Sequence, residues 1–278
     1  NYSNYSRIHK FASFAPIRPK NDCKFYIDGQ GYFEDLHKKL KNAQDEIMIA
    51  GWFISPEMPL LRPVSNPVDG SAKNFDHLEK DEKKRLENLK KDLDPTSLAA
   101  MLGKAAERGV RVYVLVYKEF ESQMYNDSEW CKAVLETLNN KNIKVLRHPT
   151  SMSQAIYWSH HEKMVIIDRK VVMMGGLDIC WGRWDTNDHQ IFDFRKDGKT
   201  HPNVDYYNPF KKEILHGKQW EKSMIERNYP RMPWHDVAVM LTGQVVFDFL
   251  THFITYWNNA REFHKEREVL FPQAPLTD

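Results

Sequence analysis

A histidine and a lysine two residues apart form the most chemically suggestive pair in this chain of 278 residues. They are His161 and Lys163, and Asp168 follows five residues after the lysine. Residues two apart in a strand point to the same face, so the imidazole and the ammonium are expected to stand together. Asp168 follows the apolar run 164–167 and falls at a turn, which favours structural pairing over chemistry.

Such a pair suits substitution at phosphorus. A neutral imidazole can attack phosphorus and form a covalent intermediate, while an ammonium stabilises the negative charge that develops on the non-bridging oxygens. A carboxylate on the other ring nitrogen would fix the tautomer. A second histidine must protonate the leaving alkoxide and then activate water or an alcohol. This scheme requires neither a metal nor another cofactor.

The sequence holds no complete second copy of this pattern. His216 and Lys218 repeat the spacing, but Ser223 stands where the aspartate should be and no apolar strand surrounds them. A metalloprotease interpretation also fails, because the chain has no His-Glu-x-x-His motif.

The residues after the pair make the pattern specific. Gly175 and Gly176 permit a close backbone approach to a ligand or to a neighbouring element. The block from Trp158 to Asp185 resembles the phospholipase D superfamily, and in particular its eukaryotic branch that hydrolyses phosphatidylcholine. Further segments of the chain resemble the same branch, so that the resemblance covers nearly all of it apart from residues 63–94; these segments are 14–18, 52–57 and 231–236.

The resemblance implies a role for individual residues. His161 is the nucleophile or acid–base group, Lys163 binds phosphate, and Asp193 orients the far nitrogen of His161. His160 is expected to be a packing or hydrogen-bonding neighbour rather than a second base. Asp178 equally suits a buried acid that caps a turn. The implied catalytic residues are His161, Lys163, Asp168 and Asp193, and the implied substrate-binding residues are Gly175, Gly176 and Asp178.

The resemblance also implies a reaction and its partners. His161 would attack phosphatidylcholine, expel choline and leave a phosphatidyl-histidine. Water would convert this intermediate to phosphatidate, and a primary alcohol would convert it to a phosphatidyl-alcohol. Family members need two facing motifs, in one chain or in a homodimer, so this chain is expected to supply the first half of an enzyme and to be incomplete alone. The expected partners are a phosphatidylcholine membrane and a second motif-bearing lobe, with no nucleic acid. The expected location is cytoplasmic and peripheral to a membrane.

Two alternatives remain open at this stage. One is a nuclease of the same superfamily that completes its site by homodimerisation. The other is a catalytically silent half that binds a lipid or a protein partner. The intact residue set disfavours the silent half, and the lipid-branch segment 181–185 disfavours the nuclease.

Composition limits the possible partners. With 40 Lys and Arg against 38 Asp and Glu, the net charge is only +2, so any anion site must be local. Three distant cysteines favour neither a disulfide framework nor a zinc knuckle. The amino terminus has no initiator Met and no apolar signal region, which is typical of a cut fragment. Polar residues interrupt the apolar stretch 237–257, which is not expected to span a membrane.

Alternating strand and helix patterns must position these residues. They predict an α/β fold, a phospholipase D-like α/β/α sandwich with a central mixed, mostly parallel sheet that forms one lobe of a two-lobed enzyme. Residues 1–22 are expected to lead into a lobe at 23–278 that carries a charged insertion at 63–94, with the second lobe absent. The expected strands are 24–27, 46–54, 110–116, 143–146 and the hairpin 164–167 with 171–174; the expected helices lie at 33–43, from 96, at 128–138 and at 243–268.

Overall fold

A computed structural model gives the structure of the chain. It describes residues 15–64, 86, 89, 93–119, 126–139, 141–149, 159–192, 200–202, 205, 230–264 and 269–270. Most of the expected insertion at 63–94 lies outside these residues, as do His216 and Lys218.

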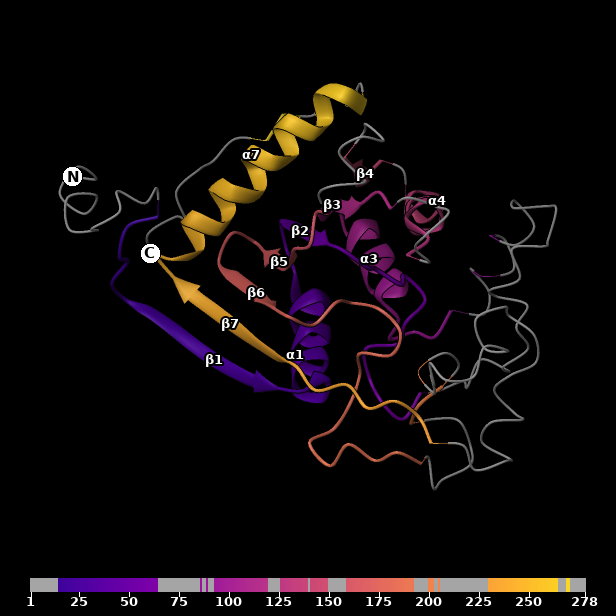
Figure 1. The fold of residues 1–278 in the computed structure, drawn as a ribbon. Helices are drawn as coiled ribbons and strands as arrows, with labels where there is room; N and C mark the ends of the chain where they lie inside the picture. The colour runs from indigo at the N-terminus through magenta and orange to yellow at the C-terminus, as the bar shows by residue number, and fades with distance from the viewer. Residues whose placement is uncertain are drawn as a thin grey trace.

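A single seven-stranded sheet organises the described residues, in the order β1-β7-β6-β5-β2-β3-β4. Figure 1 shows this sheet with helix α7 on one side and helices α1, α3 and α4 on the other. The strands are β1 (Asn21–Ile27), β2 (Glu46–Gly51), β3 (Arg111–Tyr117), β4 (Ile143–His148), β5 (Lys163–Ile167), β6 (Val171–Gly175) and β7 (Val237–Gly243). The helices are α1 (Gly29–Asn42), α3 (Leu98–Glu107), α4 (Ser128–Leu138) and α7 (Val246–His264).

The expectation of a mostly parallel sheet is wrong, although the mixed α/β/α fold class is confirmed. Only the pairs β2–β3 and β3–β4 are parallel. The other four pairs, β1–β7, β6–β7, β5–β6 and β2–β5, are antiparallel. A parallel pair needs a long crossover, which α3 and α4 supply, whereas three residues join β5 to β6 and can form only an antiparallel hairpin.

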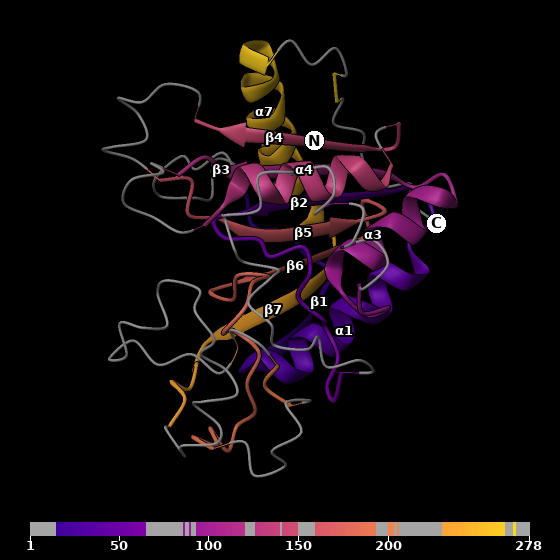
Figure 2. The ribbon, with the colours of Figure 1, turned by 90° about the vertical axis from the view of Figure 1, so that its right-hand side faces the viewer.

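Two apolar layers cover the two faces of the sheet, because successive strand residues point to opposite sides. On β2, Ile47 and Ile49 pack in the cluster that includes α1, α3 and α4, whereas Met48 and Ala50 pack in the cluster that includes α7. Figure 2, viewed from the side, shows the sheet between these helices. The α7 residues Val246, Leu250, Phe253 and Trp257 are all at most 1% exposed, which confirms the amphipathic helix expected there.

Strand β7 was missed from the sequence. Its residues belong to the apolar stretch 237–257, of which only the later part forms the expected helix.

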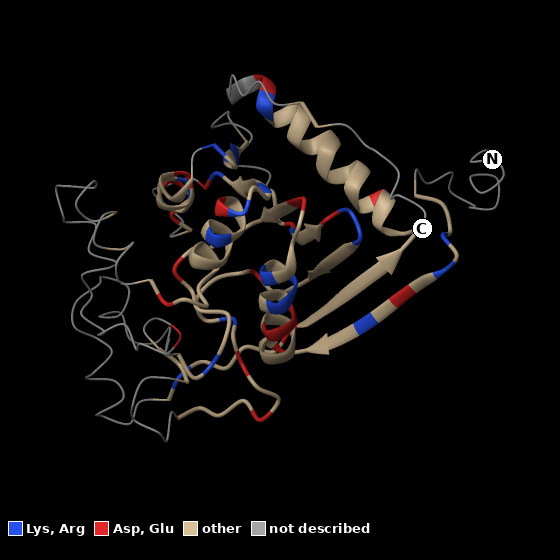
Figure 3. Ribbon diagram, turned by 180° about the vertical axis from the view of Figure 1, so that it is seen from behind, with Lys and Arg blue, Asp and Glu red and all other residues tan. Residues whose placement is uncertain are grey.

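Among the described residues, no helix combines the length and apolar character needed to cross a bilayer. Figure 3 shows Lys and Arg interspersed with Asp and Glu over the described elements, in line with the small net charge.

Candidate active site

The antiparallel pairing of β2 and β5 positions the residues of the candidate site. Gly51, the last residue of β2, lies opposite Lys163, the first residue of β5. Trp52 therefore leaves the sheet where His161 and Lys163 enter it. This register brings one aromatic ring next to both members of the sequence pair.

His161 and Lys163 converge on that ring. The His161 ring lies 4.9 Å from the Trp52 ring, centroid to centroid, in an edge arrangement. The Lys163 ammonium lies 5.3 Å from the same centroid, within the range of a cation–π contact. Burial, and after it the nearby ammonium of Lys163, lowers the pKa of His161 from its ordinary value. The imidazole is therefore neutral at neutral pH, as nucleophilic attack requires.

A buried carboxylate holds the ammonium in place. Lys163 Nζ lies 3.2 Å from Asp178 Oδ1, and the two side chains are 7% and 3% exposed. Asp178 also accepts a hydrogen bond of 3.1 Å from the backbone N–H of Phe53. Burial raises the pKa of Asp178, an effect that Lys163 opposes. Among the described residues, the buried Lys163 Nζ forms no hydrogen bond of good geometry, so its contact with Asp178 is an ion pair that leaves N–H groups without an acceptor.

The structure places Asp168 at the opposite end of β5 from Lys163. Five residues of extended chain separate their Cα atoms by roughly 16 Å. The Asp168 carboxylate accepts hydrogen bonds from the backbone N–H groups of Gln44, Asp45 and Glu46, at 3.0, 2.8 and 3.0 Å. It thereby ties the β5–β6 turn to the start of β2. This geometry favours the structural role that its position at a turn suggested, and it does not bring the Asp168 carboxylate to His161 and Lys163.

We expect Asp168→Ala to lower the free energy of unfolding by about 2–4 kcal/mol, because it removes a charged acceptor shared by three backbone N–H groups. The turnover of the folded fraction should stay within about threefold of wild type, since the site lies at the other end of the strand. Urea denaturation and turnover at a temperature where the variant is folded measure the two effects. The exposed Asp188→Ala is the control for loss of a surface carboxylate and should change stability by less than about 0.5 kcal/mol. A large loss of turnover with unchanged stability would contradict the structural role.

Both glycines of the expected substrate-binding group lie against the start of β7. A Cβ at Gly175 would collide with the backbone of Val237 and Ala238, and a Cβ at Gly176 would collide with the carboxylate of Asp236. The close approach of β7 and of the residue before it therefore explains why both positions are glycine. Contact of Gly175 and Gly176 with a substrate remains a prediction. Asp193, the expected orienting carboxylate, lies outside the described residues.

His160 is a packing neighbour, as expected, and it lies against α7. It is 3% exposed, and its ring lies 5.0 Å from the ring of Tyr256. The neighbouring Glu162 accepts a 2.8 Å hydrogen bond from His252 Nε2 on α7. Burial would raise the pKa of Glu162, but the contacts with His252 and with His160, whose Nε2 lies 3.5 Å from the carboxylate, outweigh it and lower this pKa to about 2. These contacts fix the segment before β5 on α7 and so hold the backbone of His161.

Comparison with known proteins identifies the family. The family model described as Phospholipase D matches residues 86–277, which is more than half of the chain. The chain belongs to the phospholipase D family. This confirms the resemblance that the sequence motifs carried.

The similar phospholipases D come from several eukaryotes. The chain is 37% identical to phospholipase D zeta 2 of Arabidopsis thaliana over 95% of its length. It is 32% identical to phospholipase D1 of Saccharomyces cerevisiae over 98%, and 37% identical to phospholipase D1 of Homo sapiens over 69%. The chain spans 23%, 15% and 15% of these three proteins, so it corresponds to part of each relative.

Solved structures of low sequence identity also match. A phospholipase D family member, Nuc from Salmonella typhimurium, aligns with a TM-score of 0.44 and 11% identity, over 87% of this chain and 97% of that one. NucT from Helicobacter pylori aligns with the same TM-score and identity, over 85% and 95%.

Trp52 is the site residue of this phospholipase D chain that sequence reasoning missed. The segment 52–57 was noted as part of the resemblance, but no role was assigned to its tryptophan. Its position at the end of an apolar strand was visible, whereas the pairing of that strand with the one carrying Lys163 was not. Trp52 contacts both His161 and Lys163 only because of this long-range register.

Proposed function

We propose that this chain supplies the first half-site of a phospholipase D that hydrolyses phosphatidylcholine to phosphatidate and choline. The observation that carries the proposal is the convergence of a neutral, exposed imidazole and a buried ammonium on one tryptophan. Membership of the family and the identity to eukaryotic phospholipases D support the substrate class. The near balance of acidic and basic residues gives the chain little overall positive charge to attract nucleic acid.

In the proposed reaction, a ring nitrogen of His161 attacks the phosphorus and forms an N–P bond. The P–O bond to choline breaks, and the choline oxygen takes a proton from a second histidine. The same histidine then removes a proton from water, whose oxygen attacks phosphorus and breaks the N–P bond. A primary alcohol in place of water gives a phosphatidyl-alcohol. Lys163 stabilises the charge on the non-bridging oxygens in both steps.

The second histidine is proposed to come from a second motif-bearing lobe, in the parent protein or in another copy. Exposed apolar side chains on β1 and β7 support the proposal that a further lobe packs against this one. Phe25 and Ile27 on β1 are 59% and 49% exposed, and Val237, opposite Ile27 on β7, is 45% exposed. An apolar patch of this kind is typical of an interaction surface. Peripheral attachment to a cytoplasmic membrane face is part of the same proposal.

The test is an assay of the parent protein on phosphatidylcholine vesicles. Choline should be released, and butan-1-ol should divert product from phosphatidate to phosphatidylbutanol because it replaces water as the acceptor. Butan-2-ol, a secondary alcohol of the same composition, is the matched control for effects of alcohol on the vesicles. Absence of choline release together with hydrolysis of single-stranded DNA would contradict the proposal and favour the nuclease alternative.

A further inference from the structure

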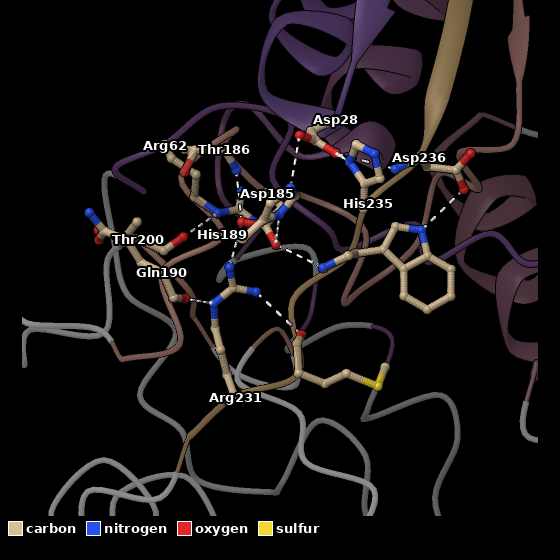
Figure 4. A network of polar contacts seen from close by, with 12 residues as sticks. Asp28, Arg62, Asp185, Thr186, His189, Gln190, Thr200, Arg231, His235 and Asp236 are labelled. Carbon is tan, nitrogen blue, oxygen red and sulfur yellow. Dashed lines mark hydrogen bonds and ion pairs between the residues drawn. The ribbon is translucent and has the colours of Figure 1, made fainter.

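Three side chains from distant parts of the sequence meet on the side of α1 where the helix begins. Asp28 directly precedes α1, His189 lies in the segment after β6, and His235 lies two residues before β7. Figure 4 shows the Asp28 carboxylate between the two imidazole rings. One ligand-type atom from each residue lies within 4.8 Å of the other two. Neither histidine belongs to the proposed phospholipase D chemistry.

The distances suit a shared cation. Asp28 Oδ2 lies 3.3 Å from His189 Nε2. Two ligands at about 2.0–2.1 Å from a tetrahedral zinc ion are separated by roughly 3.3–3.4 Å, so this pair already has the spacing of one edge of such a site. Asp28 Oδ1 lies 2.7 Å from His235 Nδ1, a direct hydrogen bond. Because the His235 side chain is 68% exposed, its ring is free to turn toward an ion.

An unsatisfied buried oxygen points into the same space. Asp28 is 1% exposed, and its Oδ1 accepts hydrogen bonds from His235 Nδ1 and from the backbone N–H of Asp236. Its Oδ2 has no hydrogen-bond partner among the described residues, although it is buried and faces His189. A buried carboxylate oxygen without a hydrogen bond is costly, and a bound cation would satisfy it.

A second carboxylate orients the ring of His189. Asp185 Oδ2 lies 3.5 Å from His189 Nδ1, which leaves Nε2 directed at Asp28. Asp185 is itself buried, with an ion pair to Arg231 and a 2.8 Å hydrogen bond from the backbone N–H of Trp234. Histidine ligands of metal ions commonly donate their other ring nitrogen to a carboxylate in this way, which fixes the tautomer.

We propose that Asp28, His189 and His235 bind a divalent transition-metal ion of the zinc class. One carboxylate and two imidazoles are a donor set that such ions prefer, and three protein ligands leave a fourth position for water or another small ligand. The ion joins the start of α1, the segment after β6 and the approach to β7. It therefore fastens the loop that follows Gly175 and Gly176 to the rest of the lobe. It is a site separate from His161 and Lys163.

The test is a titration of the full chain, freed of metal by a chelator, with Zn²⁺ and with Co²⁺. Zinc should bind at one equivalent and raise the melting temperature, because a ligand that binds only the folded state stabilises it. Cobalt should give the visible absorption of a tetrahedral nitrogen–oxygen site. In His235→Ala and Asp28→Asn the affinity should fall more than about tenfold, since loss of an outer-shell partner alone typically costs 10–100-fold.

Both variants are expected to fold, because the His235 side chain is mostly exposed and asparagine keeps the shape and one oxygen of Asp28. Circular dichroism checks this. His37→Ala on α1, outside the cluster, is the control for loss of a histidine and should bind zinc as wild type does. Failure of the wild-type chain to bind zinc at micromolar concentrations, or unchanged affinity in both cluster variants, would overturn the proposal. Neither result depends on phospholipase activity.

Discussion

Replacing His161 by alanine is expected to lower kcat/KM for phosphatidylcholine by at least about 10⁴-fold in the parent protein, because it removes the group that forms the covalent bond to phosphorus. The side chain is exposed and contacts the edge of Trp52, so its loss should leave the fold intact. Choline release measures the rate, and the melting temperature measures the fold. His37→Ala provides the matched control, as a histidine far in sequence from the motif that should keep wild-type activity.

The covalent step can be tested directly on the same variant. The wild-type protein, mixed with phosphatidylcholine and quenched within milliseconds into alkaline denaturant, should carry a phosphatidyl group on the peptide that contains His161. The variant should carry none. Turnover by His161→Ala at a rate near that of wild type would exclude this residue as the nucleophile.

Much of the fold followed from local sequence patterns. The helical spacing of Phe33, Leu36 and Leu40 predicted α1, and the largely apolar run 110–116 predicted the strand that forms β3. Such patterns report which residues are buried but not which strands are neighbours. The sheet was therefore expected to be mostly parallel, and β7, which pairs with both β1 and β6, was not recognised. Its apolar residues continue almost directly into α7, so no break in composition marked it.

The candidate site was predictable to the extent that it is local. His161 and Lys163 are two residues apart, and strand alternation alone places them on one face. Trp52 and the contact between Lys163 and Asp178 depend on pairing and loop geometry across long sequence separations. The cluster of Asp28, His189 and His235 spans more than 200 residues and follows no motif spacing, so the sequence alone gave no indication that these side chains meet.

Lys163→Met is expected to lower kcat by about 10²–10³-fold, because it removes a preorganised cation from the phosphate oxygens. It should also destabilise the fold by about 3–5 kcal/mol, since Asp178 would be left buried without its cation. The two effects separate in the double variant Lys163→Met with Asp178→Asn. Asparagine is neutral and can still accept the hydrogen bond from the Phe53 N–H, so stability should return while the rate stays low.

The comparison of rate and stability decides what Lys163 does. Exposed Lys170, in the turn of the same hairpin, provides the matched control, and Lys170→Met should change neither quantity appreciably. If the double variant regained both stability and turnover, Lys163 would serve only to neutralise Asp178. If turnover stayed low in a protein of restored stability, the ammonium acts on the substrate. The geometry favours the second outcome, because the ion pair with Asp178 holds the amine near His161 and, with three N–H groups on the ammonium, leaves donors for a phosphate oxygen.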